Sequence, residues 1–439
     1  MKFTTSIKTL RDAFYKLMNA VQPKTALPIL SCVFMTLKDN LLTMLTTDLT
    51  NYIAVSESVK STVNGTICVS AKVINDIINS LSPDAEITFE LIKKTLFLTS
   101  NDSKFELETE DANDFPTYAN IEKVEKISLS KDHIKAIGQV IHAASTDELH
   151  RSMNGVYFDN DSKLSIVATD GHRLSLYKTA KLDKKFQFLL NLSTARLLNK
   201  YGKEHNEVDI EFNTQFIKAV IGNMAIVSRL IDDTYPDYAS VIPTEFVNTA
   251  SFDKKELTTA VKLASMIAGE QFNRVILNIG KENCVLSSMD EEKGLKFKTT
   301  ISCENKESYD AEFNGAYFLD MLNATENEKD KPILFEFTPT MLHVNQGSYM
   351  EIVMQLRNVN EKPTTKTEAK TKIEEAHKTR TAEATKTAET KPEPPKTEPV
   401  KATDTPKPEE TKLTKKVKKE KPVSSTEKPI KSTKNKKVA

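Results

Sequence analysis

Residues 3–21 read FTTSIKTLRDAFYKLMNAV. Apolar residues recur in this stretch every three to four positions, which is the period of one helix face, and a short alternating segment precedes them. The pattern returns twice, because residues 127–144 read ISLSKDHIKAIGQVIHAA and residues 250–268 read ASFDKKELTTAVKLASMIA. The first core positions of the three helices lie 124 and 123 residues apart, at Leu10, Ile134 and Leu257. The chain therefore contains an internal threefold repeat, each unit opening with a short strand and an amphipathic helix.

Later landmarks keep nearly the same spacing. The tripeptides IIN, LLN and MLN, at 77–79, 197–199 and 321–323, close a second helix in each unit, and strands reading ITFEL, VDIEF and ILFEF follow them. LTTD at 45–48 likewise matches VATD at 167–170. A period near 122 residues is too long for a solenoid, so one α+β domain occurs three times. We expect domains at 1–122, 123–246 and 247–358, followed by a tail at 359–439.

The tail differs from the body in composition. Residues 361–439 contain no Phe, Tyr, Trp or Gly, and they carry 22 Lys and Arg against 13 Asp and Glu, so the rest of the chain is acidic. A segment of this kind cannot bury enough apolar surface to offset the entropy of ordering, so we predict a disordered basic tail. It serves either as a solubilising tether or as a salt-sensitive contact to nucleic acid.

Several classes of protein are excluded. No run of about 18 apolar residues is present, and the N-terminus lacks the apolar core of a signal peptide, so we expect a cytoplasmic protein without a membrane span. The four cysteines are isolated in sequence and no His pair has ligand spacing, so we expect neither a metal site nor a cofactor. Glycine-rich phosphate-binding motifs are absent.

The predicted helices collect bases on the face opposite their apolar stripe. This is the ordinary appearance of a solvated helix face, but it occurs on four of the six helices of an acidic body. The bases are Lys8 and Arg11; Lys131 and Lys135; Arg196, Lys200 and Lys203; and Lys254, Lys255 and Lys262.

From Met1 to about Arg357 the chain resembles the bacterial DNA polymerase III β subunit family, the β sliding clamps. The segments that match the family are MKFT at the start, ALPILS at 26–31, LTTDL at 45–49, RSMNGVYFD at 151–159, LSIVATDGHRL at 164–174, DTYPDYASVIP at 233–243 and VMQLR at 353–357. The resemblance implies a clamp fold of three domains per chain. Two chains would form a head-to-tail homodimeric ring, with helices lining the hole and sheets outside. Duplex DNA would thread the hole without being read, and the replicative polymerase and the clamp loader would bind the ring.

The resemblance also implies positions for the subunit seam and for DNA contacts. Apolar residues of a sheet edge in the first domain would meet a helix end in the third domain of the partner. Phe105 and Leu107 match one side, Met266 and Ile267 match the other, and Lys104 could pair with residues 290–292. For DNA contact the candidates are Lys24, Arg151, Arg196 and Lys200.

A third implied site is the cleft in which polymerase and clamp loader insert a short peptide with a Gln and a few apolar residues. Leu174 and Pro243 would form its walls, Met354 would be an adaptable contact, and Gly171 would allow a turn that presents His172 and Arg173. The full matching set is Met153, Thr169, Gly171, His172, Arg173, Leu174, Pro243, Met354, Leu356 and Arg357. Relatives often have a proline where this chain has Gln355.

Three other functions remain to be weighed. Asp170, His172 and Arg173 could suggest acid–base chemistry, but no nucleophile elbow is present and the ATD motif recurs as TTD without the His, so the Asp is interpreted as structural. A sequence-specific DNA binder would need a recognition helix, and no such motif is found. A diverged clamp-like scaffold that does not encircle DNA is the remaining alternative.

Overall fold

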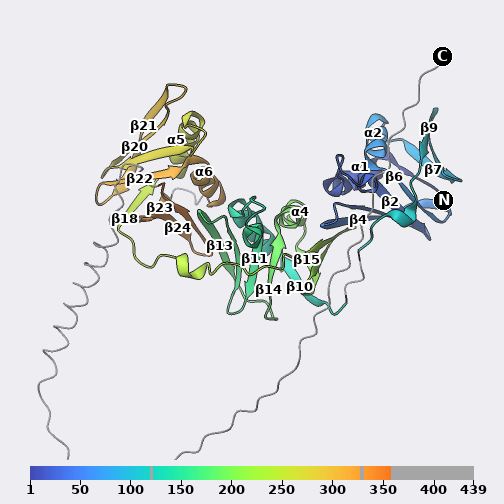
Figure 1. Ribbon diagram of the computed structural model, residues 1–439, viewed down its shortest axis with the longest axis horizontal. Coiled ribbons are helices and arrows are strands. Elements are labelled where there is room, and N and C mark those ends of the chain that lie inside the picture. The colour runs from blue at the N-terminus through green and yellow to red at the C-terminus, as the bar shows by residue number, and fades with distance from the viewer. Residues whose placement is uncertain (119–121, 327–330, 357–439) are drawn as a thin grey trace, which may run out of the picture. The chain divides into compact units, whose positions relative to one another are not determined.

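The structure is a computed structural model that describes residues 1–118, 122–326 and 331–356 (Figure 1). The predicted disordered tail and Arg357 lie outside the described residues. The described part of the chain contains six α-helices, two in each repeat, as the periodicity predicted. No helix in these ranges has the length and apolarity needed to cross a membrane.

The repeats run through nearly the same order of elements, and repeat 1 has one additional strand, β5, between its two helices. Repeat 1 consists of β1 (Lys2–Ser6), α1 (Ile7–Leu17), β2 (Cys32–Lys38), β3 (Leu41–Thr47), β4 (Asn51–Ser58), β5 (Lys60–Val63), β6 (Gly65–Ser70), α2 (Ala71–Ser80), β7 (Glu86–Ile92), β8 (Thr95–Ser100) and β9 (Ser103–Glu108). Repeat 2 consists of β10 (Glu125–Ser130), α3 (Lys131–Val140), β11 (Gly155–Asn160), β12 (Leu164–Thr169), β13 (Arg173–Thr179), β14 (Gln187–Asn191), α4 (Leu192–Gly202), β15 (Glu207–Phe212), β16 (Phe216–Ile221) and β17 (Met224–Arg229).

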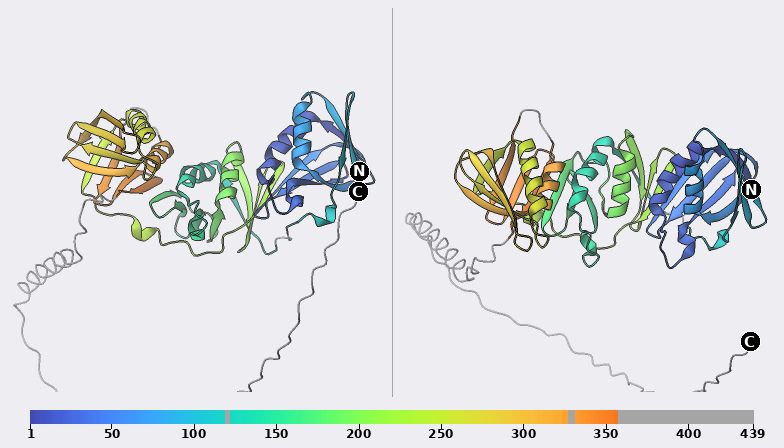
Figure 2. Two further views of the ribbon diagram at one scale, coloured as in Figure 1. Left: turned by 45° about the horizontal axis from the view of Figure 1, so that its top comes forward. Right: turned by 90° about the horizontal axis from the view of Figure 1, so that it is seen from above.

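Repeat 3 consists of β18 (Asn248–Phe252), α5 (Lys254–Ile267), β19 (Arg274–Ile279), β20 (Asn283–Asp290), β21 (Leu295–Asn305), β22 (Tyr309–Asn314), α6 (Gly315–Ala324), β23 (Ile333–Thr338), β24 (Met341–Gln346) and β25 (Tyr349–Met354). In each repeat the two helices lie side by side against the strands (Figure 2). The α+β prediction is therefore confirmed for all three units.

Every helix begins directly at the end of a strand. The last strand residue, or the residue after it, is a Ser, Asn or Asp whose side chain accepts a backbone N–H of the first turn, so strand and helix share one cap. These caps are Ser6, Ser70, Ser130, Asn191, Asp253 and Asn314. A residue that both ends a strand and caps a helix leaves no loop between them, which fixes each helix against its sheet.

The strands of the described ranges form three antiparallel sheets, and two of these sheets cross a repeat boundary. β17 of repeat 2 pairs with β4 of repeat 1, and β25 of repeat 3 pairs with β13 of repeat 2. The last strand of one repeat thus pairs each time with the fourth strand of the repeat before it. Because both junctions have the same ladder, the three units are joined by one repeated interface.

The core lies between helices and sheets. One continuous cluster of buried side chains spans repeats 1 and 2, and a second fills repeat 3. The apolar stripe of α1 is fully inside the first cluster, with Leu10, Phe14 and Leu17 almost completely buried. Two smaller clusters lie at the repeat junctions, and one of them contains residues of the predicted peptide cleft.

The cap of α3 carries a pH-sensitive group. His133 Nδ1 accepts the backbone N–H of Ser130 at 3.0 Å, so this ring must be neutral to serve as acceptor. Burial lowers the pKa of His133, against a smaller opposing effect of Asp132. A histidine whose pKa is lowered by folding contributes its full stabilisation when the pH is above the pKa of the unfolded state, which is about 6.5. As the pH falls below that value, the unfolded state takes up the proton first and the stabilisation is lost.

We therefore expect the urea concentration at the midpoint of unfolding to decrease as the pH is lowered from 7 to 5, and His133 to contribute to that decrease. In the His133→Gln variant an uncharged side chain can replace the acceptor of the capping box, so this part of the pH dependence should disappear. His133→Ala should cost about 1 kcal/mol at pH 7, because the cap interaction is lost. An unchanged pH profile in His133→Gln would show that the ring does not act through its protonation.

Candidate functional site

The predicted cleft residues meet where β13 and β25 pair. Leu174 lies opposite Ile352 and Arg173 lies opposite Val353 in this ladder. Beyond the ladder, Met354 N donates to His172 O at 2.8 Å, and Leu356 N donates to Glu312 O at 2.8 Å. Segments separated by about 180 positions in the sequence are therefore held together by main-chain hydrogen bonds at the junction of repeats 2 and 3.

A tight turn connects β12 to β13. Thr169 Oγ1 donates to Arg173 O at 2.6 Å, and one Asp170 carboxylate oxygen accepts the N–H groups of His172 and Arg173 at 2.9 and 3.0 Å. Gly171 sits at the bend with φ +85°, a left-handed conformation that glycine adopts without strain. The prediction that Gly171 permits a turn is confirmed, and His172 is exposed at its tip.

Repeat 1 contains the same turn. Thr47 Oγ1 donates to Asn51 O at 2.9 Å, and Asp48 Oδ1 accepts the N–H groups of Thr50 and Asn51. Leu49 takes the place of Gly171, with φ +71°. Because the aspartate performs the same turn-closing task where no histidine follows, the structural interpretation of Asp170 is confirmed.

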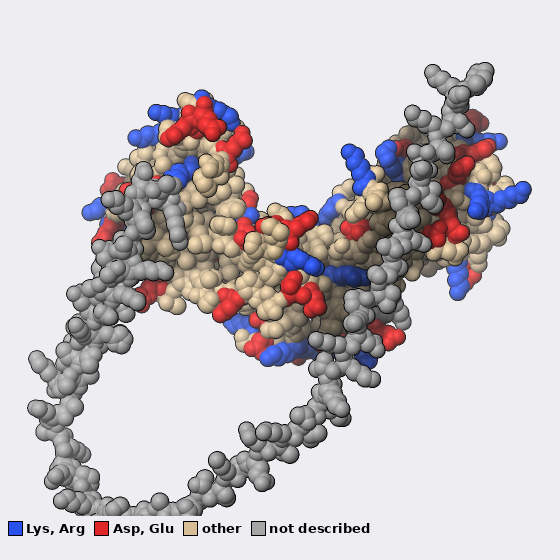
Figure 3. All heavy atoms as spheres, in the orientation of Figure 1, with Lys and Arg blue, Asp and Glu red and all other residues tan. Residues whose placement is uncertain are grey.

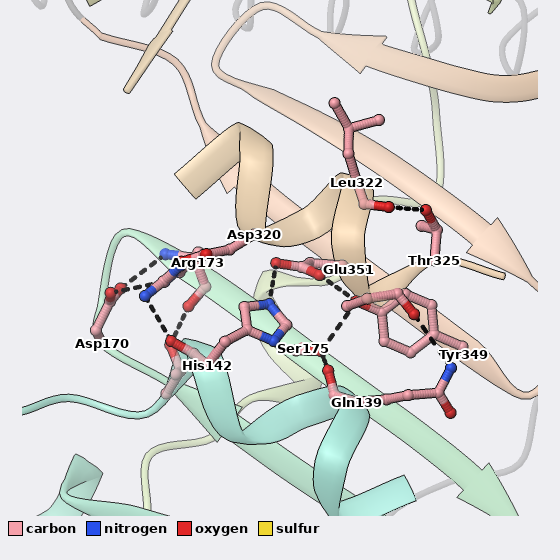
Figure 4. A network of polar contacts seen from close by, with 12 residues as sticks. Gln139, His142, Asp170, Arg173, Ser175, Asp320, Leu322, Thr325, Tyr349 and Glu351 are labelled. Atoms are coloured by element: carbon pink, nitrogen blue, oxygen red, sulfur yellow. Dashed lines mark hydrogen bonds and ion pairs between the residues drawn. The ribbon is translucent and has the colours of Figure 1, made fainter. Parts of the chain in front are cut away.

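Arg173 does not point outward as the sequence suggested. Its Nε donates to Asp170 at 3.0 Å, Nη1 donates to Asp320 of α6 at 2.7 Å, and Nη2 donates to the carbonyl of His142. The guanidinium also lies over the ring of Tyr317, 4.3 Å from its centroid. Figure 4 shows Arg173 with its hydrogen-bond partners Asp170, Asp320 and His142, so Arg173 ties repeat 2 to repeat 3 instead of offering free donors to a peptide.

A buried carboxylate lies next to this arginine. Glu351 is fully buried, and its oxygens contact His142 Nε2 at 2.8 Å and the hydroxyl of Tyr349 (Figure 4). Burial, reinforced by the nearby Glu351 charge, raises the pKa of Tyr349 far above its usual value, so this hydroxyl is a donor at any physiological pH. A buried carboxylate needs hydrogen-bond partners to offset its desolvation, and Glu351 has two in His142 and Tyr349.

Leu174 also departs from its predicted place as a wall of the cleft. Only 4% of it is exposed, because it packs in a cluster with Val167, Leu176 and Tyr235. Its position in the ladder opposite Ile352 points the side chain into this cluster. Leu174 is therefore mainly core, and a charge placed there would disrupt the junction itself.

The remaining cleft candidates differ in exposure. Met354 is 42% exposed, whereas Met153, Pro243 and Leu356 are half-buried and Thr169 is buried. Pro243 follows Ile242, which packs against the cluster around Leu174. The structure thus brings Thr169, His172, Leu174 and Met354 together, while Pro243 reaches the region from a neighbouring loop and Met153 ends a short 3-10 turn before β11.

Gln355 takes over the anchoring of the chain at the position where relatives often have proline. Its backbone N–H donates to Thr340 O at 2.8 Å, and its side-chain amide donates to Tyr309 OH at 2.8 Å and to Thr338 O at 3.0 Å. A proline could make none of the three bonds. The main chain at Met354 and Leu356 is therefore fixed by an amide network rather than by a rigid ring.

Two residues of the junction had no local signal in the sequence. Tyr317 lies 6.4 Å from the ring of His172, and Asp320 pairs with Arg173. Both lie on α6, three residues apart, on the side of the helix that faces repeat 2. Their helix is not one of the four with bases on the face opposite the apolar stripe, so the charge pattern of the sequence did not indicate the pairing of Asp320 with Arg173.

The predicted DNA contacts lie in different environments. Lys24, Arg151 and Arg196 are exposed. Lys200 instead lies over the rings of Tyr15 and Tyr201, with Nζ 4.3 and 4.9 Å from their centroids. A cation between two aromatic faces stabilises the contact of α4 with α1, so this lysine has a structural task in addition to any phosphate contact.

Other bases of the helix faces cap neighbouring helices. Arg11 donates to the carbonyls of Ile78, Asn79 and Leu81 at the end of α2, and Lys254 donates to Thr325 O after α6. Lys135 forms an ion pair with Glu326. These three residues satisfy helix C-termini or a carboxylate within the chain, so not every base on the helix faces is free to meet a ligand.

The predicted seam residues lie on two free surfaces. Lys104, Phe105 and Leu107 belong to β9, and among the described residues β8 is its only neighbour in the order of its sheet. Met266, 72% exposed, and Ile267 end α5. Other exposed apolar side chains occur in the same part of repeat 3, namely Leu263, Phe272, Met289 and Leu295. Apolar exposure on this scale is typical of an interaction surface.

Charged side chains of both signs are spread over the surface, as Figure 3 shows for one face. Within the described ranges no group of three or more His, Cys, Asp or Glu side chains is arranged to hold a metal ion.

Three consecutive family models match the chain. They are the N-terminal, central and C-terminal domains of the DNA polymerase III beta subunit, at residues 1–119, 128–237 and 239–356. The chain belongs to the DNA polymerase III beta subunit family. The three models follow one another in order along the body of the chain, which agrees with the threefold repeat.

Relatives share modest identity over nearly their whole length. The beta sliding clamp of Rickettsia felis is 27% identical over 75% of this chain and 91% of its own length. That of Vibrio cholerae is 25% identical over 81% of this chain and 100% of its own. The crystal structure of the sliding clamp (DNA polymerase III subunit beta) from Bartonella birtlesii has a TM-score of 0.77 at 23% identity, covering 82% of this chain and all of that one. This likeness confirms the clamp fold.

Proposed function

We propose that this family member is a non-catalytic sliding clamp of the cytoplasm: a ring of two chains that encircles duplex DNA, is loaded by a clamp loader and tethers the replicative polymerase. The observation that carries the proposal is the repeated junction. A closed ring of two chains needs three strand-to-strand interfaces per subunit. Two of these three are formed within the chain. The last strand of repeat 1, β9, and the fourth strand of repeat 3, β21, take part in neither of these two interfaces.

The leftover strands are complementary. β9 has a free side, and β21 pairs with β18 only at Cys303–Asn305, which leaves the start of β21 free on that side. A β9 strand from a second chain on β21 would repeat the β17–β4 and β25–β13 junctions. Head-to-tail interfaces of this kind close into rings when the rotation per unit divides a full turn.

The two existing junctions predict the register of the third. In each junction, the first residue of one repeat's last strand lies opposite a residue in the fourth strand of the repeat before it. On its other side, this fourth-strand residue pairs with the residue that lies four positions before the aspartate of the tight turn. Met224 lies opposite Val55, which pairs with Met44, and Tyr349 lies opposite Tyr177, which pairs with Ile166. In repeat 3 the turn aspartate is Asp290, and four positions earlier Leu286 pairs with Thr299.

Ser103 should therefore lie opposite Thr299 of the second chain. This register places Phe105 against Phe297, Leu107 against Leu295, and Glu106 against Lys296. Apolar pairs then meet on the helix side and an ion pair forms on the other side, which is a favourable cross-strand pattern. It replaces the pairing of Lys104 with residues 290–292 that the sequence suggested.

Contact with DNA should be weak and independent of sequence. The exposed bases Lys24, Arg151 and Arg196 are single side chains that can meet phosphates, and none lies in a recognition helix of a known DNA-binding motif. Contacts of this kind are salt-dependent, whereas a closed ring is retained on DNA by topology.

Retention on circular DNA tests the function. Rings assembled on a nicked plasmid should survive a wash in 1 M NaCl and should be lost when the plasmid is linearised. Loss from the intact circle at high salt, with a stable dimer in solution, would favour the clamp-like scaffold that does not encircle DNA.

For the partner site, we propose that the surface around His172 and Met354 receives a short peptide with a Gln and a Leu/Phe pair. Its support is geometric, because these two exposed residues are joined by a main-chain hydrogen bond and the ring of His172 lies near that of Tyr317. The site straddles repeats 2 and 3, so the Arg173 junction determines its shape.

A further inference from the structure

A cavity of about 350 Å³ lies where α1 of repeat 1 meets α2 and the end of α4 of repeat 2. This volume is at the lower end of the range of about 300–1,000 Å³ that small-molecule sites occupy, so the cavity has room for one small ligand. Its lining includes Arg11 and Tyr15 of α1, Asn19 just after that helix, Asn75 and Asn79 of α2, and Lys200 of α4.

The lining carries two positive charges and, among the described residues, no negative one. Neither Arg11 nor Lys200 forms an ion pair within the described part of the chain. Asp76, which follows Asn75 in the sequence, pairs with Lys72 at 2.7 Å and is not part of the lining. A cavity with this charge attracts an anionic ligand.

The cavity also contains an aromatic ring that is exposed and yet held in place. Tyr15 is 62% exposed. Its ring meets the ring of Tyr201 edge-on, with the centroids 6.2 Å apart, and Lys200 Nζ lies 4.3 Å from its centroid. Its carbonyl accepts Asn19 Nδ2 at 2.9 Å, which fixes the main chain at the end of α1. An exposed aromatic ring that its neighbours hold in place is a surface on which another planar ring can stack.

Two amide side chains of α2 complete the lining. The described part of the chain supplies no hydrogen bond to the side chain of Asn75 or of Asn79. An amide group has two donor hydrogens and an acceptor oxygen, so it can bond the polar edge of a nucleobase. The cations, the exposed ring and the amides therefore match the phosphate, the planar base and the base edge of a nucleotide.

The junction of repeats 2 and 3 contains a corresponding cavity that lacks these features. By the 124-residue spacing of α1 and α3, Gln139 takes the place of Tyr15, and it is only 8% exposed. Lys135 takes the place of Arg11 and forms an ion pair with Glu326. An exposed ring and unpaired cations are thus not needed to pack the helices at a repeat junction, which favours a role in binding for those of the first junction.

We propose that the cavity between repeats 1 and 2 binds one unpaired nucleotide whose base stacks on Tyr15. The amides of Asn75 and Asn79 bond the edge of the base, and the phosphate lies near Arg11 and Lys200. Stacking of this kind tolerates any base, because every base has a π face. A base inside a duplex would first have to leave its stack, so the ligand is a single strand or a free nucleotide.

Titration of a labelled single-stranded oligothymidylate into the full chain, followed by fluorescence anisotropy, tests the site. Tyr15→Ala should weaken binding about fivefold or more, which is the effect of losing one stacked base. Tyr15→Phe keeps the ring and should bind like the wild type. The matched control Leu41→Ala shortens another exposed apolar side chain of repeat 1, outside the cavity, and should also bind like the wild type. Equal affinity of Tyr15→Ala and the wild type would overturn the proposal.

The same titration with an abasic strand of equal length separates stacking from charge. This strand keeps its phosphates, so Tyr15→Ala should leave its affinity unchanged. An equal loss with both strands would show that the substitution had only deformed the cavity, and would overturn the stacking. Displacement of the oligothymidylate by thymidine monophosphate would show that a free nucleotide suffices, whereas its failure to compete would assign the cavity to a nucleotide within a strand. A short linear strand needs no closed ring, so these results do not depend on the encirclement proposed above.

Discussion

Replacing Ile267 by Asp should convert the protein from a dimer to a monomer at micromolar concentration. In the proposed ring this side chain, at the end of α5, contacts the Phe105 and Leu107 side of the partner's β9. A carboxylate left unpaired in such a contact costs roughly 3–5 kcal/mol. A ring has two seams, so the cost applies twice, and sedimentation velocity measures the result.

The matched control is Val63→Asp, an exposed apolar residue of repeat 1 that lies outside the seam strands. It should remain dimeric with the same unfolding midpoint as the wild type. A dimeric Ile267→Asp variant would remove this residue from the interface.

The register of the seam can be tested separately by charge reversal. Glu106→Lys places two lysines opposite each other and Lys296→Glu places two glutamates opposite each other, so both single variants should dimerise more weakly. The double variant should recover most of the wild-type dimer. If it does not, the two strands pair in another register, while the Ile267→Asp result still reports on the interface itself.

At the partner site, Met354→Asp should weaken binding of a Gln- and Leu/Phe-containing peptide at least tenfold. An apolar anchor is worth roughly 1.5–3 kcal/mol, and 1.4 kcal/mol is a factor of ten in affinity. Because Met354 is 42% exposed, the fold and the dimer should be unaffected. Fluorescence anisotropy of a labelled peptide measures the affinity, and a polymerase extension assay should show loss of stimulation.

Leu174→Asp provides the contrast. This residue is buried among Val167, Leu176 and Tyr235, so the substitution should lower the unfolding midpoint as well as peptide binding. Equal peptide affinity in Met354→Asp and the wild type would move the partner site elsewhere. A Leu174→Asp variant with normal stability but no peptide binding would return Leu174 to the wall of the cleft.

Local pattern was enough to predict the repeated architecture. The helix period at Leu10, Ile134 and Leu257 and the recurring TTD and ATD turns depend on residues within a few positions of one another. Such short-range patterns report secondary structure and, when repeated, the domain count. The role of Asp170 could be predicted for the same reason, since its partners His172 and Arg173 are two and three residues away.

Which way side chains turn and which strands stay unpaired were decided only by tertiary structure. Arg173 is drawn inward by Asp320, 147 residues further along, and Leu174 is covered by a ladder partner 178 residues away. The open sides of β9, β10 and β21 likewise depend on which strands the rest of the chain brings beside them. A strand's sequence specifies its two faces through the alternation of side chains, whereas its neighbours bind through backbone groups that every residue carries, so pairing is not encoded locally.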